Sequence, residues 1–162
     1  MNNSKLDFRD ATVEDVPLIL NFIKELAEYE KLLDDVVATE ELLKEWLFEK
    51  KRAEIFFPVL NKKEIGFVLF FHNFSTFVGK AGLYLEDIYI KPEYRGNGYG
   101  KEIFKHLAKI AMERNCGRLE LTCLDWNSPS IEFYKSMGAI PMEDWTIYRI
   151  TSDKFKNIIN KN

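Results

Sequence analysis

Runs rich in Ile, Phe and Val alternate along the chain with segments whose apolar residues recur at helical spacing. The strand-like runs cover residues 6–9, 54–60, 65–74, 83–90, 119–124 and 146–150. Helical spacing begins after Thr12 and Thr39, and returns after residues 100 and 128. Thr12, Thr39 and Ser128 are residues that cap helices, and Gly138 is a typical C-terminal stop for the last of them.

These elements follow the order β-α-α-β-β-β-α-β-α-β. Three consecutive strands in the middle favour an antiparallel meander, with a hairpin turn at residues 61–64. The strand–helix–strand units that follow favour parallel crossovers. Because no linker rich in Pro, Gly or Ser divides the chain, we expect one domain over residues 1–162 with a mixed sheet. Whether the polar tail after residue 150 forms another helix is left open.

The composition is that of a globular protein, with 46% apolar and 30% charged residues. A net charge of −3 and a pI of about 5.5 give no basic surface for nucleic acid or anionic lipid, so we expect neither as a partner. No apolar stretch reaches 18 residues, and the N-terminus lacks the apolar core of a signal peptide. We therefore expect a cytoplasmic protein.

The two cysteines, Cys116 and Cys123, lie seven residues apart and form no CxxC pair. His72 and His106 are distant from them in sequence. This spacing gives no support to a metal site, and we expect two free, buried thiols and no metal cofactor.

A glycine-rich segment connects the strand at residues 83–90 to the next helix. Gly96, Gly98 and Gly100 leave backbone N–H groups unobstructed at the start of that helix, where the aligned peptide dipoles favour an anion. Arg95 and Lys101 add positive charge on either side. The segment predicts a loop that binds a pyrophosphate, although the three glycines alone are equally typical of a flexible connection.

The same segment resembles the acetyl-CoA-binding motif of the GCN5-related N-acetyltransferases, Q/R-x-x-G-x-G/A, which Arg95, Gly98 and Gly100 satisfy. The resemblance is greatest to the diamine (spermidine/spermine) and thialysine acetyltransferases. It includes IKELAEYE at 23–30, LYLED at 83–87, DWN at 125–127 and FYK at 133–135. It implies an α/β fold whose mixed sheet of six to seven strands contains a splayed parallel pair and is flanked by about four helices. It also implies acetyl-CoA as cosubstrate and a homodimer.

The resemblance also assigns contacts to acetyl-CoA. Backbone groups of Ile88 and Ile90 would hold the pantetheine arm, and the start of the helix after residue 127 would touch CoA. For Asn127 and Ser130 the alternative role is simple capping of that helix. The expected contacts are Ile88, Tyr89, Ile90, Arg95, Gly96, Asn97, Gly98, Tyr99, Gly100, Lys101, Asn127 and Ser130.

Acetyl transfer to an amine requires that the amine lose a proton and that the leaving thiolate be protonated or stabilised. The resemblance assigns the general acid to Tyr134, for which packing beside Phe133 is the alternative role. The candidate general base is Glu86, acting through a water molecule. Solvated surface acids are the alternative interpretation of Glu86 and Asp87.

Strict alternation along the strand at residues 83–90 puts Glu86 on one face with Tyr84 and Ile88, and puts Asp87 on the other. In the family this strand carries a β-bulge. Such a bulge would re-aim these side chains.

For the acceptor amine, carboxylates attract an ammonium group and aromatic faces add cation–π attraction. Singly, such residues are more often surface charges or packing aromatics. The residues expected to bind the acceptor, matched as a group to the family, are Tyr29, Glu30, Asp87, Glu143, Asp144 and Trp145.

The chain departs from the polyamine-preferring members of the family just before Gly79. Those members carry Asp-Pro-Trp there, whereas this chain has Ser75, Thr76 and Phe77. It therefore lacks a carboxylate that would hold a second cationic group. This favours a shorter acceptor, such as lysine or thialysine, over spermidine.

The sequence thus predicts an N-acetyltransferase that moves acetyl from acetyl-CoA to a primary amine of a small molecule by direct attack in a ternary complex. Two alternatives stay open. One is an acetyltransferase acting on protein lysines or N-termini, and the other is a non-catalytic module that binds acyl-CoA.

Overall fold

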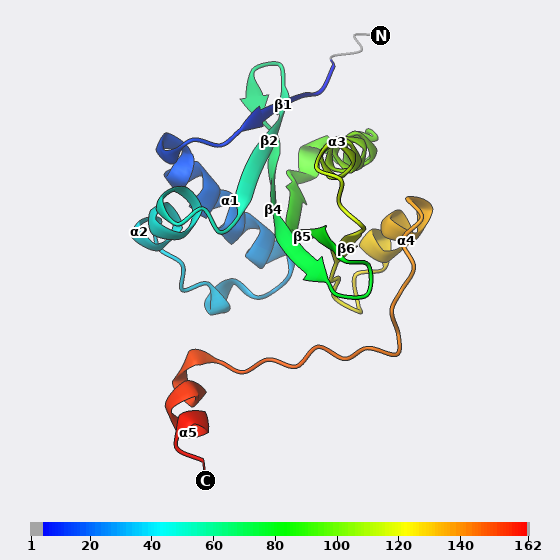
Figure 1. The fold of residues 1–162 in the computed structure, drawn as a ribbon. Helices are drawn as coiled ribbons and strands as arrows, with labels where there is room; N and C mark the ends of the chain where they lie inside the picture. The colour runs from blue at the N-terminus through cyan, green and yellow to red at the C-terminus, as the bar shows by residue number, and fades with distance from the viewer. Residues whose placement is uncertain (1–4, 162) are drawn as a thin grey trace. The chain divides into compact units, whose positions relative to one another are not determined.

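Six strands form one mixed sheet in the computed structural model, which describes residues 5–161 (Figure 1). They are β1 (Asp7–Asp10), β2 (Glu54–Leu60), β3 (Lys63–Glu64), β4 (Gly66–Ser75), β5 (Lys80–Ile90) and β6 (Leu119–Leu121). The strand order is β1-β2-β4-β5-β6, and β3 pairs with β2. All pairs are antiparallel except β5 and β6, which are parallel, so the predicted mixed sheet is confirmed.

The α-helices of the described residues are α1 (Val16–Tyr29), α2 (Glu40–Leu43), α3 (Tyr99–Glu113), α4 (Ser128–Ser136) and α5 (Phe155–Ile159). Thr39 caps α2 as predicted, whereas Thr12 caps the 3-10 turn Val13–Asp15 that leads into α1, and the N-cap of α1 itself is Asp15. Asp15 Oδ2 accepts a hydrogen bond from Thr12 N at 2.8 Å, and Thr39 Oγ1 accepts one from Leu42 N at 3.3 Å. These bonds satisfy backbone donors that a helix start would otherwise leave unpaired.

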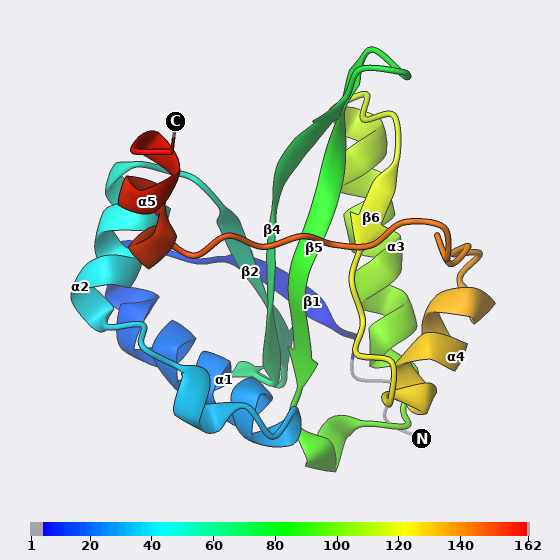
Figure 2. The ribbon, with the colours of Figure 1, turned by 90° about the horizontal axis from the view of Figure 1, so that it is seen from below.

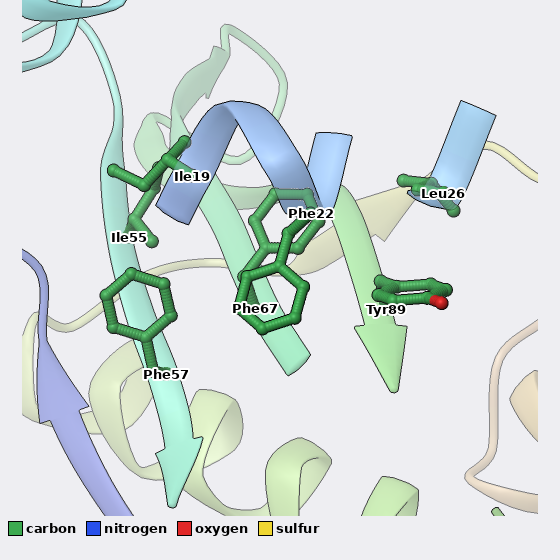
Figure 3. Close-up of a cluster of buried hydrophobic side chains, with 7 residues drawn as sticks. All are labelled: Ile19, Phe22, Leu26, Ile55, Phe57, Phe67 and Tyr89. Carbon is green, nitrogen blue, oxygen red and sulfur yellow. The ribbon is translucent and has the colours of Figure 1, made fainter. Parts of the chain in front are cut away.

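Helices α1 and α3 cover opposite faces of the sheet (Figure 2). The buried side of α1 packs on three strands in one apolar cluster (Figure 3). Its members are Ile19, Phe22, Leu26, Ile55, Phe57, Phe67 and Tyr89. The Phe22 ring stacks on the Phe67 ring at 5.8 Å between centroids. Because burying each such side chain contributes about 1.5–3 kcal/mol, the cluster firmly fixes α1 against the end of β5.

The parallel pair separates toward the C-terminal ends of its strands. The ladder joins Leu83 to Leu119 and ends where Leu85 faces Leu121, whereas β5 continues to Ile90. The expected splayed pair is therefore present. The strand predicted over residues 119–124 is shorter than expected, because its last three residues no longer lie beside β5 to form a ladder.

The described chain divides into two compact units, one up to Leu124 and the other from Asp125. In the second unit, α4 is capped by Asn127, whose side chain accepts a hydrogen bond from Ser130 N at 3.4 Å. The prediction of Ser128 as the cap is therefore wrong by one residue. Gly138 follows the helix at a φ of +93°, as its role as a stop requires.

The strand predicted over residues 146–150 is not formed in the described chain, where this segment has no regular structure. Its alternating pattern favours a strand, but a strand also needs a neighbouring edge to satisfy its backbone groups. The helix left open for the polar tail is present as α5. The single-domain organisation stays a prediction.

The structure also describes the two cysteines and the apolar character of the helices. Cys116 and Cys123 form no disulfide in the part of the chain that the structure describes, and both are half-buried rather than buried. Among the described residues, no helix has the length and apolar character needed to cross a membrane.

Gly66 makes a close contact that tests how β4 supports the end of β5. It lies opposite Ile90, and a Cβ on Gly66 would sit 1.9 Å from the Tyr89 carbonyl oxygen. We expect Gly66→Ala to lower the free energy of unfolding by about 1–3 kcal/mol in urea denaturation, because backbone must move. Gly82→Ala is the matched control, since its Cβ would meet the end of the Asn73 side chain at 2.3 Å, which can rotate away. Equal losses in the two variants would contradict this prediction.

Candidate active site

The glycine segment forms an open loop at the N-terminus of α3. Gly96 and Gly98 have φ values of +78° and +82°, a left-handed conformation that side chains other than glycine rarely adopt. A Cβ at either position would meet no atom within 4 Å, so the backbone here is accessible. Because the first N–H groups of a helix have no partner within it, the loop presents donors and a positive dipole end to an anion. The phosphate-binding role of the loop stays a prediction.

The side chain of Asn97 stabilises the loop from within. Asn97 Nδ2 donates to the carbonyl oxygens of Tyr94 and Arg95, at 3.0 and 3.1 Å. Lys101 lies in the first turn of α3, where its charge would add to the positive end of the helix. The two hydrogen bonds of Asn97 stabilise the loop around the two left-handed glycines.

Arg95 directs its side chain toward β5 and α1. Its Nε donates to the Ile90 carbonyl oxygen at 2.7 Å. Its guanidinium carbon lies 4.6 Å from the centroid of the Tyr29 ring and 5.4 Å from that of Tyr89. Arg95 therefore joins the loop to the last residue of α1, a contact that the sequence motif does not reveal.

Strand β5 contains one residue more than β4 can pair with. Phe70 faces Leu85, and Leu69, which precedes Phe70 in β4, faces Asp87. Glu86 therefore has no partner across the ladder. This is the β-bulge implied by the resemblance. Bulges bend the strand and re-aim side chains next to them.

The bulge reverses the alternation of side chains along β5. Asp87 faces Leu69, which packs against the α1 cluster, and directly opposed residues share a face of the sheet. Tyr84 faces Phe71, two residues beyond Leu69 on the same face, and their rings are 5.0 Å apart. Tyr84 and Asp87 therefore both lie on the α1 face. The prediction from strict alternation, which separated them, is wrong because of the extra residue.

This placement brings Asp87 into an acidic cluster with Glu86 and with Glu30 at the C-terminal end of α1. Burial raises the pKa of Asp87 to about 7, and the negative charges of Glu86 and Glu30 add to the shift. Burial also raises the pKa of Glu30. A carboxyl group that titrates near neutral pH is suited to accept and release a proton.

The other predicted site residues on β5 differ in how deeply they are buried. Ile88 and Ile90 are half-buried on the part of the strand beyond its ladder with β6. Tyr89 is buried in the α1 cluster, and burial together with a hydrogen bond to Glu25 raises its pKa to about 12. Any contact of Tyr89 with a cosubstrate would therefore be made through its backbone.

The other predicted site residues lie in the second unit. Tyr134 is on α4 with its ring 5.6 Å from that of Phe133, and Asn127 and Ser130 form the start of that helix. The acidic-aromatic group of Glu143, Asp144 and Trp145 is exposed and outside any helix or strand. The proximity of these side chains to the loop and to the acidic cluster stays a prediction.

Ser75 lies at the far end of the β4–β5 hairpin. It is buried, and its hydroxyl accepts a hydrogen bond from Val78 N at 3.2 Å, which stabilises the turn. Six residues along β4 separate it from Leu69, the partner of Asp87, a distance of about 20 Å. The side chain at position 75 is thus remote from the acidic cluster.

Among residues 5–161 there is no group of three or more His, Cys, Asp and Glu that would hold a metal.

Comparisons with known proteins identify the family of the chain. The model of the acetyltransferase (GNAT) family matches residues 20–139. The thialysine N-epsilon-acetyltransferase of Sus scrofa is 37% identical over 94% of this chain and 96% of its own length. An L-ornithine N5-acetyltransferase of Arabidopsis thaliana is 31% identical over 93% of this chain and 86% of its own length. A spermidine/spermine N(1)-acetyltransferase-like protein of Homo sapiens is 30% identical over 95% of this chain but only 24% of its own length.

Solved structures share the fold. An integron cassette protein from the mobile metagenome of V. cholerae superposes with a TM-score of 0.78 at 25% identity, covering 96% of this chain and 98% of that one. An aminoglycoside acetyltransferase from a soil metagenome, in complex with sisomicin, has a TM-score of 0.75 at 15% identity, covering 90% and 95%. The second likeness concerns the fold alone.

The raised pKa of Asp87 predicts a pH-dependent stability. Folded Asp87 keeps its proton up to a pH of about 7, whereas the unfolded residue loses it near 3.8, so this group lowers the free energy of unfolding as pH rises between those values. We expect the melting temperature of Asp87→Asn, relative to the wild type, to increase from pH 4 to pH 7 and then level off. The exposed Asp34→Asn serves as control. A constant difference between Asp87→Asn and the wild type would contradict the prediction.

Proposed function

Because the chain belongs to the acetyltransferase (GNAT) family, we propose that it transfers acetyl from acetyl-CoA to the primary amine of a small basic molecule, with a lysine-like amine such as thialysine preferred. The observation that carries this proposal is the arrangement around the end of β5. There, Glu86 and Asp87 lie on the part of the strand beyond its ladder with β6 and form the acidic cluster with Glu30. The open N-terminus of α3 follows the end of this part.

The cosubstrate supplies an activated acetyl group and carries phosphates that match the loop. The N–H groups around Gly96 and Gly98 would bind the pyrophosphate, helped by Lys101. The backbone of Ile88 and Ile90 would hold the pantetheine arm along the free part of β5. The loop's accessible backbone supports this assignment, because a phosphate can reach donors that no side chain covers.

The acceptor amine must lose its proton before it attacks the thioester, and the acidic cluster supplies the groups for this step. Asp87, with its pKa near 7, would accept the proton directly or through water, and Glu86 would help to hold the ammonium form. This differs from the sequence-based expectation, in which Glu86 was the base and Asp87 bound the acceptor. Tyr134 would then protonate the leaving thiolate.

Relatives of this chain support a basic amine as acceptor. Their names concern thialysine, ornithine and spermidine or spermine, each of which carries at least one ammonium group at neutral pH. Carboxylates of Glu30 and Asp87 and the ring of Tyr29 would attract such a group. Since Ser75 is remote from this cluster, the preference for thialysine over spermidine is based on the greater similarity to thialysine acetyltransferases over their whole length.

The direct test is acetyl transfer from acetyl-CoA over a panel of thialysine, ornithine, spermidine and a lysine-containing peptide. We expect the highest kcat/KM for thialysine, and a rise in melting temperature with acetyl-CoA. Gly98→Asp should abolish that rise by placing a carboxylate against the phosphates. Gly79→Asp is the matched control, because Gly79 also has a positive φ of +70° and open space around it, but lies on the β4–β5 hairpin. Acetylation of the peptide alone would favour a protein acceptor, and binding without transfer would favour an acyl-CoA-binding module.

The base assignment predicts a pH profile. Because the base must be ionised to accept a proton, kcat/KM should rise with pH through about 7 in the wild type. We expect Asp87→Asn to lower kcat by about 10²- to 10⁴-fold and to remove this rise, whereas Glu86→Gln should lower it less and keep the rise. Tyr134→Phe should lower kcat without moving the rise. Loss of the rise in Glu86→Gln instead would return the base to Glu86.

A further inference from the structure

Arg95 makes three contacts with parts of the chain outside the glycine loop. Its backbone begins the loop, yet its Nε bonds to the Ile90 carbonyl at 2.7 Å, and its guanidinium lies over the rings of Tyr29 and Tyr89. A planar guanidinium can stack on rings while donating in its own plane, which a lysine ammonium cannot do. The side chain thus connects the loop, the end of β5 and the end of α1.

The contact with Tyr29 leads directly to the acidic cluster. Tyr29 is the last residue of α1, and the next residue, Glu30, lies close enough to Asp87 to raise its pKa. Tyr29 is not fully buried, since 37% of it is exposed. Its ring therefore has room to change position, and its contact with Arg95 joins it to the loop.

We propose that Arg95 is a positioning residue that couples the glycine loop to the acceptor side of the site, so that occupancy of the loop strengthens binding of the amine. This rests on the proposed function and assigns to Arg95 a role beyond supplying charge to phosphates. An anion held by the loop fixes the backbone of Arg95. The side chain then holds the Tyr29 ring in the arrangement that receives the amine, and pre-organisation of this kind raises affinity.

The coupling has a reciprocal consequence. If CoA tightens binding of the amine by some factor, the amine must tighten binding of CoA by the same factor. A residue that only supplied charge to the phosphates would change CoA affinity without changing that factor. The factor by which CoA tightens binding of the amine, measured in Arg95 variants, therefore distinguishes a positioning role from the role of supplying charge to the phosphates.

The experiment measures thialysine binding by calorimetry, without CoA and at saturating CoA, which lacks the acetyl group and allows no reaction. In the wild type we expect CoA to tighten thialysine binding by about fivefold or more. In Arg95→Ala and in Tyr29→Leu the factor should fall to within about twofold of one, and combining the two changes should cause no further loss, because both break the same contact. Tyr29→Phe, which keeps the ring, should retain more of the factor than Tyr29→Leu.

Lys50→Ala is the control, because Lys50 lies 3.9 Å from the centroid of the Trp46 ring in an exposed contact away from the site, and its loss should leave the factor unchanged. Arg95 is exposed and Tyr29 partly so, and thermal unfolding verifies that the variants are folded. An unchanged factor in Arg95→Ala, or no coupling in the wild type, overturns the proposal. Failure of the proposed function would appear separately, as absence of acetyl transfer by the wild type.

Discussion

Strand β5 holds one residue more than its antiparallel partner can match, and the position of that residue decides which side chains face α1. With Glu86 unpaired, Tyr84 and Asp87 come to the same face. Without it, Asp87 would face away from α1 and from Glu30. The burial that raises the pKa of Asp87, together with the neighbouring charges of Glu86 and Glu30, therefore depends on the pairing of Leu69 with Asp87. A short irregularity in one ladder thus creates a titratable group suited to proton transfer.

The sequence predicted those features whose cause is local. Thr39 before α2 and the glycine after α4 act through groups within a few residues and lie where they were expected, and Thr12 caps the 3-10 turn that leads into α1. The segment from Arg95 to Gly100 was recognised through its resemblance to the family motif, and its glycines lie at an open helix N-terminus, as that motif requires. The mixed sheet followed from the order of the elements, because connection rules depend little on individual side chains.

Features that depend on partners distant in sequence were not predicted by the pattern alone. The position of the bulge requires knowledge of which residue of β4 faces Asp87, and alternation along β5 contains no such information. The contact of Arg95 with Tyr29 joins residues on two elements that only the folded chain brings together. Residues 146–150 show the opposite error, in which a strand pattern was present but no ladder formed in the described chain.

The charges around β5 would suit the two substrates of the proposed reaction, which have opposite signs. The N-terminal end of α3 carries the positive end of its helix dipole at Gly98, whereas the C-terminal end of α1 carries the negative end beside Glu30. Phosphates are favoured at the first and an ammonium group at the second. The two ends are joined by Arg95, whose contacts span both. Because each end would repel the other's substrate, the arrangement would also orient the proposed pair, with the amine and the acyl group meeting along β5.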